Sequence, residues 1–194
     1  MKKNQFTVMI CLALLAILNL SHTSNAQDAK PRKSPKAAVT QKIGVDTDIV
    51  INYSRPGVKG RTIWGDLVPY GMFAGNSFSN NNAFPWRAGA DENTTIEFNK
   101  DVMINGQKLA AGKYSIHMVA GKTEFQVMFN RKTDGWGSYT YNAADNALVV
   151  SVSPVESAHT EWLEYSFEDL ADYSAVACLK WDNLKVPFRI EAGK

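Results

Sequence analysis

Apolar and polar residues alternate over most of the chain after Ala37, in short runs bounded by glycine, proline, asparagine or aspartate. Alternation with a period of two places the apolar side chains on one face of a strand. No run of about 11 or more residues shows the spacing of an amphipathic helix. The pattern therefore predicts an all-β chain of about nine or ten strands, packed as an antiparallel, jelly-roll-like β-sandwich.

Two hairpins are predicted from their turn residues. Gly121-Lys122 fits a two-residue type II′ turn, which would set Met118 opposite Phe125 and gather apolar side chains on one face. Asn105-Gly106 is a strong type I′ signal and predicts a second hairpin with this pair as its loop. Both turns need residues that accept a positive φ, so turn chemistry and alternation support the same pairings.

The remaining apolar stripes predict further strands at 48–53, 94–99, 148–152, 163–167, 175–181 and 184–191. The segment before 163, which carries His159, is expected to be a solvated loop. Pro187 interrupts the last strand and cannot donate to a ladder. We therefore expect that strand to lie at a sheet edge or to pair on one side only.

The N-terminus departs from this pattern. Lys2 and Lys3 precede an almost wholly apolar run, Phe6–Leu20, and small residues follow at Ser24 and Ala26. These features are those of a secretory signal peptide, and we expect cleavage after Ala26. The apolar run of about 15 residues is shorter than the roughly 20 that span a bilayer, so no membrane span is expected after cleavage.

The chain is thus expected to divide into a signal peptide over residues 1–26, a flexible leader over 27–36 and a single β-sandwich domain over 37–192. Removal of the signal takes away two of the 21 basic residues and leaves as many basic as acidic ones. Nucleic-acid binding driven by bulk charge is therefore disfavoured. Cys178 would be the remaining cysteine, and its apolar surroundings in sequence predict a buried thiol.

Six segments carry a resemblance to a known family: Ser34–Val39, Ile51–Gly71, Trp86–Phe98, Val102–Ile116, Phe129–Asn142 and Leu184–Ile190. In these segments the chain resembles DUF2911, a bacterial family of unknown function. The resemblance implies an exported, periplasmic or extracellular β-rich domain, and it implies no reaction, cofactor or catalytic residue. The chain departs from the family at Met72–Pro85, where it has a longer loop than usual.

Arg55–Gly71 has no period of its own and combines glycines, prolines, cations and aromatic residues, as shaped functional loops do. With Trp86–Glu92 and the turn at Trp136 it supplies the candidate binding residues: Arg55, Lys59, Arg61, Trp64, Trp86, Arg87, Glu92 and Trp136, with Tyr139 beside them. Arginine and aromatic side chains together suit recognition of sugars or carboxylate-bearing polymers. The alternative remains open that the tryptophans pack the core and that Arg55 pairs with Asp66 or Glu92.

Motifs for chemistry are sparse. No spacing of His, Cys or carboxylates indicates a metal site, and no glycine-rich phosphate loop indicates a nucleotide cofactor, so we predict neither. His117 is expected on the outward, exposed face of its strand. Asp91 and Glu92 are the most interesting carboxylates, but adjacent side chains on an extended chain point apart, which argues against an acid/base pair.

Three functions follow from these observations. The first is an exported, non-catalytic module that binds a ligand such as a glycan or another envelope component. The second is a hydrolase acting on envelope glycans or esters, if Asp91, Glu92 and His117 converge in space. The third is a structural or interaction protein that uses an apolar edge near Pro187.

Overall fold

The computed structural model describes residues 30–193, of which those from residue 33 onward belong to one compact unit. The predicted signal peptide lies outside the described residues, as does the predicted leader up to residue 29. The first strand begins at Lys36. Among residues 30–193, no helix has the length and apolar character needed to cross a membrane.

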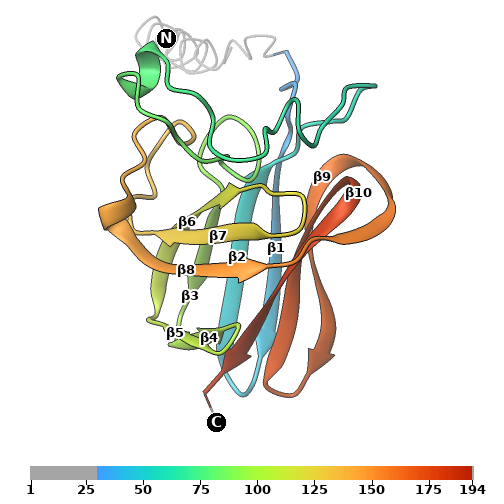
Figure 1. The fold of residues 1–194 in the computed structure, drawn as a ribbon. Helices are drawn as coiled ribbons and strands as arrows, with labels where there is room; N and C mark the ends of the chain where they lie inside the picture. The colour runs from blue at the N-terminus through green and yellow to red at the C-terminus, as the bar shows by residue number, and fades with distance from the viewer. Residues whose placement is uncertain (1–29, 194) are drawn as a thin grey trace, which may run out of the picture. The chain divides into compact units, whose positions relative to one another are not determined.

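Ten strands form two antiparallel sheets, which confirms the all-β prediction. One sheet has the order β1-β2-β3-β6-β7-β8 and the other β5-β4-β10-β9 (Figure 1). The bounds are β1 Lys36–Ile43, β2 Thr47–Ser54, β3 Thr95–Phe98, β4 Val102–Ile104, β5 Gln107–Leu109, β6 Gly112–Val119, β7 Phe125–Asn130, β8 Asn146–Val152, β9 Val155–Ala171 and β10 Ser174–Ala192. Two short 3-10 helices, η1 Ser77–Ser79 and η2 Ala143–Asp145, lie in the long connections.

Both sheets contribute to one hydrophobic core. Ile51 and Ile116 are fully buried from the six-stranded sheet, and Trp181 and Phe188 are buried from β10 in the four-stranded sheet. The rings of Phe129 on β7 and Phe188 on β10 lie 5.7 Å apart, edge to face. Since burying one such side chain is worth about 1.5–3 kcal/mol, this shared core accounts for the packing of the two sheets.

The hairpin at Asn105-Gly106 forms as predicted. Asn105 has a φ of 47° and Gly106 a φ of 77°, and Ile104 pairs with Gln107 across the two-residue turn. Asn105 Oδ1 also accepts a hydrogen bond from the backbone N–H of Arg189 on β10, at 2.8 Å. The turn therefore closes the hairpin and ties it to its neighbouring strand.

The register predicted for β6 and β7 is wrong by two residues. Met118 lies opposite Val127, not Phe125, because five residues, 120–124, connect the strands in place of a two-residue turn. Gly121 is packed against the carbonyl of Glu124, and it lacks the positive φ that a type II′ turn would require. A slip of two preserves which side chains face inward, so the predicted apolar face is still buried.

Residues 155–192 form two long strands, joined by a short turn, rather than the predicted shorter ones. β9 runs through the segment expected to be a loop, and His159 lies within it, exposed. β10 continues past Asp182, where a φ of 53° and two register shifts bend the strand without ending it. Pro187 lies between the residues paired with β9, which end at Lys185, and those paired with β4, which begin at Ile190.

Candidate functional site

Two loop segments predicted to be functional, residues 55–71 and 86–93, meet around a cavity of about 710 Å³. The first segment follows β2 and the second precedes β3, and β2 and β3 pair directly in the six-stranded sheet. The pairing brings the end of β2 and the start of β3 together, although the 40 residues 55–94 separate them in sequence. The volume falls within the range of about 300–1,000 Å³ that is typical of small-ligand sites.

Four of the eight predicted binding residues line this cavity: Lys59, Arg61, Trp86 and Arg87. Lys33 adds a further cation and Asp91 one carboxylate, so positive charge predominates among the lining side chains. Lys59 and Arg61 are exposed. Arg61 donates from Nε to the Val58 carbonyl and from Nη2 to that of Gly57, which fixes the guanidinium at the mouth of the loop.

Tryptophans form an apolar wall of the cavity. Trp86 and Trp181 both line it and stack with their ring centroids 5.8 Å apart, and Trp64 meets both edge to face. Trp181 is only 1% exposed, and its indole Nε1–H has no acceptor among the described residues. A buried donor without a partner costs free energy, which the packing of the surrounding aromatic rings must offset.

Arg87 joins the cavity to a second loop. Its Nη1 donates to the backbone carbonyl of Asp91 at 2.6 Å, and its guanidinium lies 5.1 Å from the ring centroid of Tyr139. Gly137 packs directly beneath it, at a φ of 72°. Arg87 is therefore held by internal contacts on one side while it lines the cavity on the other.

The other predicted binding residues lie elsewhere. Arg55 binds β9, through Nε to the Leu163 carbonyl at 2.9 Å and through Nη2 to Glu164 at 3.3 Å, so its ion pair is made with Glu164, a partner that the sequence did not suggest. Glu92 pairs with Lys36 at 3.0 Å. Among the tryptophans, Trp64 packs against the core and Trp136 is 61% exposed outside the cavity.

The prediction that His117 is exposed is wrong. Its side chain is buried at 2% exposure because residues 131–141 fold across the outer face of β6 and β7. Ser115 donates its hydroxyl proton to the Lys132 carbonyl, so it accepts from His117 Nε2–H at 2.8 Å. Ser138 then donates to Nδ1 at 2.7 Å, and the ring is held neutral. Burial, aided by Arg87, lowers the pKa of His117 to about 4.

The predicted catalytic trio does not share a cavity. Asp91 lines the tryptophan-walled cavity, Glu92 a smaller one near Lys36, and His117 a third of about 350 Å³. Ser138, which His117 could in principle activate, is 1% exposed and lines none of them. A nucleophile must reach its substrate, so this geometry favours a packing role for the His117 hydrogen bonds.

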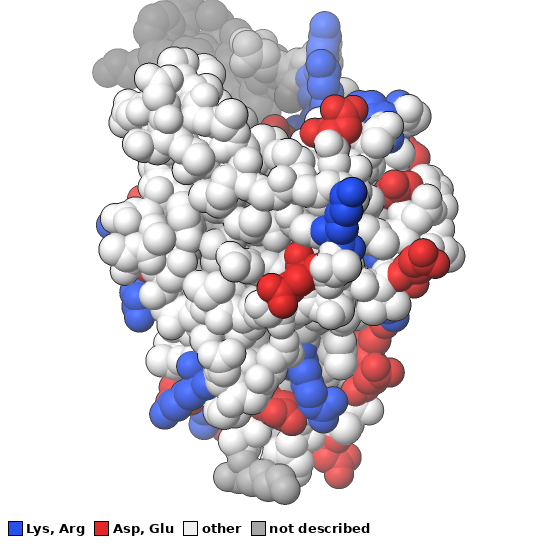
Figure 2. Space-filling view, in the orientation of Figure 1, with Lys and Arg blue, Asp and Glu red and all other residues white. Residues whose placement is uncertain are grey.

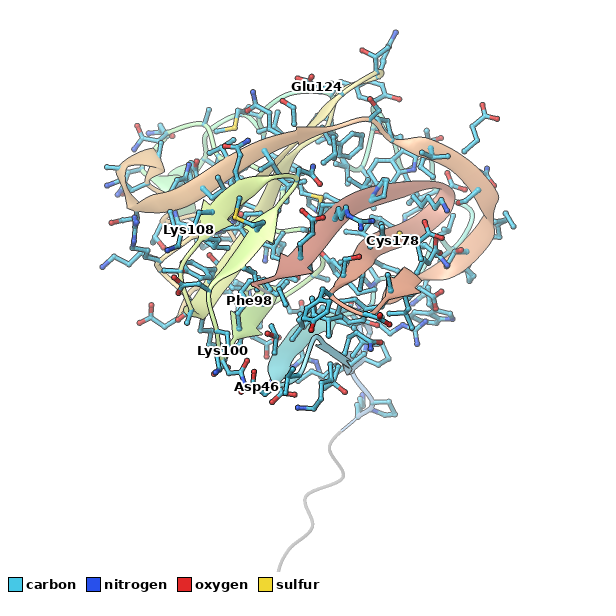
Figure 3. The ribbon with its side chains drawn as sticks, turned by 90° about the horizontal axis from the view of Figure 1, so that it is seen from below. Asp46, Phe98, Lys100, Lys108, Glu124 and Cys178 are labelled. Atoms are coloured by element: carbon cyan, nitrogen blue, oxygen red, sulfur yellow. The ribbon has the colours of Figure 1, made fainter. Side chains whose placement is uncertain are left out.

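Cys178 is buried and unpaired by disulfide, as its sequence context predicted (Figure 3). Burial, with the nearby Glu168 carboxylate, raises the pKa of its thiol to about 12. The thiolate is therefore disfavoured, and the residue serves as a small core side chain of β10.

The family model described as a protein of unknown function, DUF2911, matches residues 34–190. This chain belongs to the DUF2911 family. The match includes both segments that line the tryptophan-walled cavity, and the 72–85 loop lies within it. For this DUF2911 member, no curated protein and no solved structure matches the chain.

Several cavity residues of this DUF2911 chain were not among the predicted binding residues. Trp181 comes from β10, Phe73 from the longer 72–85 loop, and Lys33 from the expected leader. Trp181 carries no local signal, because it belongs to an apolar stripe like any other core residue. Its place at the cavity depends on how the two sheets pack, which alternation along one strand does not encode.

Proposed function

We propose that this DUF2911 chain is an exported, non-catalytic binding module that holds an acidic component of the cell envelope, such as a carboxylate-bearing glycan. The observation that carries the proposal is the meeting of Lys59, Arg61 and Arg87 around a wall of tryptophans. Export is supported by the basic residues, apolar run and small residues of the first 26 positions.

The chemistry of the cavity suits an anionic ring-bearing ligand. The Nη1 donors of Arg61 bond no described residue, and a guanidinium binds carboxylates through paired hydrogen bonds. Sugar rings stack on aromatic side chains, and Phe73 offers a partly exposed ring at the cavity, whereas Trp86 and Trp181 are buried and form the apolar wall behind it.

Binding is tested with the protein purified from the periplasm of a bacterial host, where a mass beginning at Gln27 would support export. The probes are an acidic-glycan array, insoluble peptidoglycan, and labelled hyaluronan and chondroitin sulfate oligosaccharides. The test variant combines Lys59→Asn, which tolerates the φ of 49° at that position, with Arg61→Gln. We expect at least tenfold weaker binding, since charge-assisted hydrogen bonds are worth about 1.5–3 kcal/mol each.

The matched control is Lys108→Gln, an exposed cation on β5 that pairs with Asp101 and lies outside the cavity (Figure 3). It should bind like the wild type. Trp86→Ala is unsuitable as a test because Trp86 is buried in the core. Equal binding by the wild type and the double variant, or binding of no probe by either, would contradict the proposal.

A further inference from the structure

An aromatic row leads from the cavity to the surface. Phe73 lines the cavity and stacks on Phe84, with centroids 5.4 Å apart and planes 2° from parallel. Phe84 meets Tyr139 edge to face at 5.1 Å, and Tyr139 in turn contacts Phe78 at 5.4 Å. Phe78, on η1, is 74% exposed. The row thus begins at the cavity wall and ends at an exposed ring.

The two loops that form this row carry no charge. No Asp, Glu, Lys or Arg occurs in residues 67–86 or in residues 135–144. Figure 2 shows a broad surface without charged side chains over these loops, while Lys, Arg, Asp and Glu are scattered over the rest of the same face. Beyond Arg87, which lies over Tyr139 at the inner end of the row, a charged group bound over these loops would find no counter-ion, so the outer part of the surface suits an uncharged partner.

Polar groups around the exposed ring are free to bind. Asn80–Asn82 are exposed, and their side chains make no hydrogen bond with described residues. Thr140 is exposed on the facing loop. Aromatic rings interspersed with amides and hydroxyls are the contact chemistry of surfaces that recognise polar, uncharged groups. An apolar lipid phase would instead leave these amides unsatisfied, which disfavours insertion into a membrane.

We propose that the aromatic row extends the cavity into a site for a polysaccharide chain, with its acidic unit in the cavity and uncharged sugar units over Tyr139 and Phe78. This inference rests on the proposed function, because the acidic unit occupies the same cavity. Arg87 contributes to the cavity and to the aromatic row, since it lines the cavity and lies over the ring of Tyr139. The ligand class is therefore an acidic polymer with neutral units, longer than the cavity itself.

The test measures affinity against ligand length. Hyaluronan oligosaccharides of two, four, six and eight sugar units, which alternate acidic uronate with an uncharged N-acetylated amino sugar, are titrated by calorimetry. We expect wild-type affinity to rise at least tenfold from two to six units. Phe78→Ala should lose that gain and keep the affinity for two units, because a stacked ring contributes only to longer ligands. Leu170→Ala, at an exposed apolar residue on β9, should behave like the wild type.

The outcomes separate the two proposals. Wild-type binding that does not depend on length, or a length gain kept by Phe78→Ala, overturns the extended site and leaves the cavity proposal standing. Absence of binding at every length overturns both. Co-sedimentation with phosphatidylcholine vesicles that Phe78→Ala abolishes would identify the exposed ring as a membrane contact and would also overturn the extended site.

Discussion

His117 holds its neighbours in a buried row of hydrogen bonds. The row runs from Ser138 through the imidazole to Ser115 and ends on the Lys132 carbonyl. It joins the 131–141 segment to the outer face of the six-stranded sheet. Protonation would give the ring two donors and no acceptor site for the Ser138 hydroxyl, beside the Arg87 cation. The row therefore depends on a neutral imidazole.

Stability should consequently fall as the pH is lowered. The pKa of His117 is about 4 in the folded protein and about 6.5 in the unfolded chain, so the unfolded chain takes up the proton first. The stabilisation is complete above about pH 6.5 and is lost as the pH falls toward 4, by about 3 kcal/mol in total. Urea unfolding of wild type and His117→Gln at pH 7.5 and 5 measures this.

In that experiment, the wild type should lose more stability than His117→Gln between the two pH values. The same slope in His117→Gln as in the wild type would show that the buried imidazole does not set the pH dependence.

β9 and β10 form the longest paired element of the fold. The carboxylate of Glu168 on β9 lies between Lys180 at 2.6 Å and Lys185 at 2.8 Å on β10. Hydrogen bonds from Lys180 and then Lys185 lower the pKa of Glu168 to about 2. Glu168 thus links β9 to the two parts of β10 that lie before and after the bend at Asp182.

Glu168→Gln should destabilise the protein by about 1–2 kcal/mol at pH 7, a value discounted for partial solvent exposure. The folded pKa is depressed, so this contribution is present above about pH 4.5 and is lost as the pH falls toward 2. Thermal unfolding at pH 7 and pH 2.5 measures it. The melting temperatures of variant and wild type should differ at the higher pH and converge at the lower one; a constant difference would point to lost packing instead.

Elements were predictable where their signal is local. The dipeptide Asn105-Gly106 was sufficient to predict the β4–β5 hairpin, because both residues accept a positive φ and a type I′ turn fixes the register. The β6–β7 connection was misjudged because the glycine at 121 takes another conformation, while alternation cannot distinguish slips of two. The continuity of β10 was missed because Asp182-Asn183 resembles a turn in sequence, whereas bulged pairing with β9 keeps the strand intact.

At the scale of the whole molecule, the tryptophan-walled cavity lies where the two sheets share their core. Trp181 belongs to β10, and Trp64 meets both Trp181 and Phe125 of β7. The loops of the site were predicted from composition, since glycine, proline, cations and aromatics in one segment mark a shaped loop. Which cations share the cavity was not predictable, because Arg55 and Arg87 sit in similar sequence surroundings and are separated only by packing.

One core should give one unfolding transition. In urea, tryptophan fluorescence and far-UV circular dichroism should report the same midpoint, because the tryptophans contact strands of both sheets. Phe188→Ala on β10 should shift both midpoints together and cost about 3–5 kcal/mol, since its ring packs against Phe129 of the other sheet. Two separate transitions would indicate that the sheets unfold independently.

The contact between Gly137 and Arg87 also has an evolutionary consequence. A Cβ at position 137 would overlap the Arg87 guanidinium, and the φ of 72° is costly for any other residue. Neither residue can be substituted alone without a cost. A side chain at position 137 would displace the Arg87 guanidinium, and a shorter residue at position 87 would leave unfilled space next to Gly137. We therefore expect Gly137 and Arg87 to be retained together or substituted together within this family. Where they are substituted, the contact of Arg87 with Tyr139 should be lost as well.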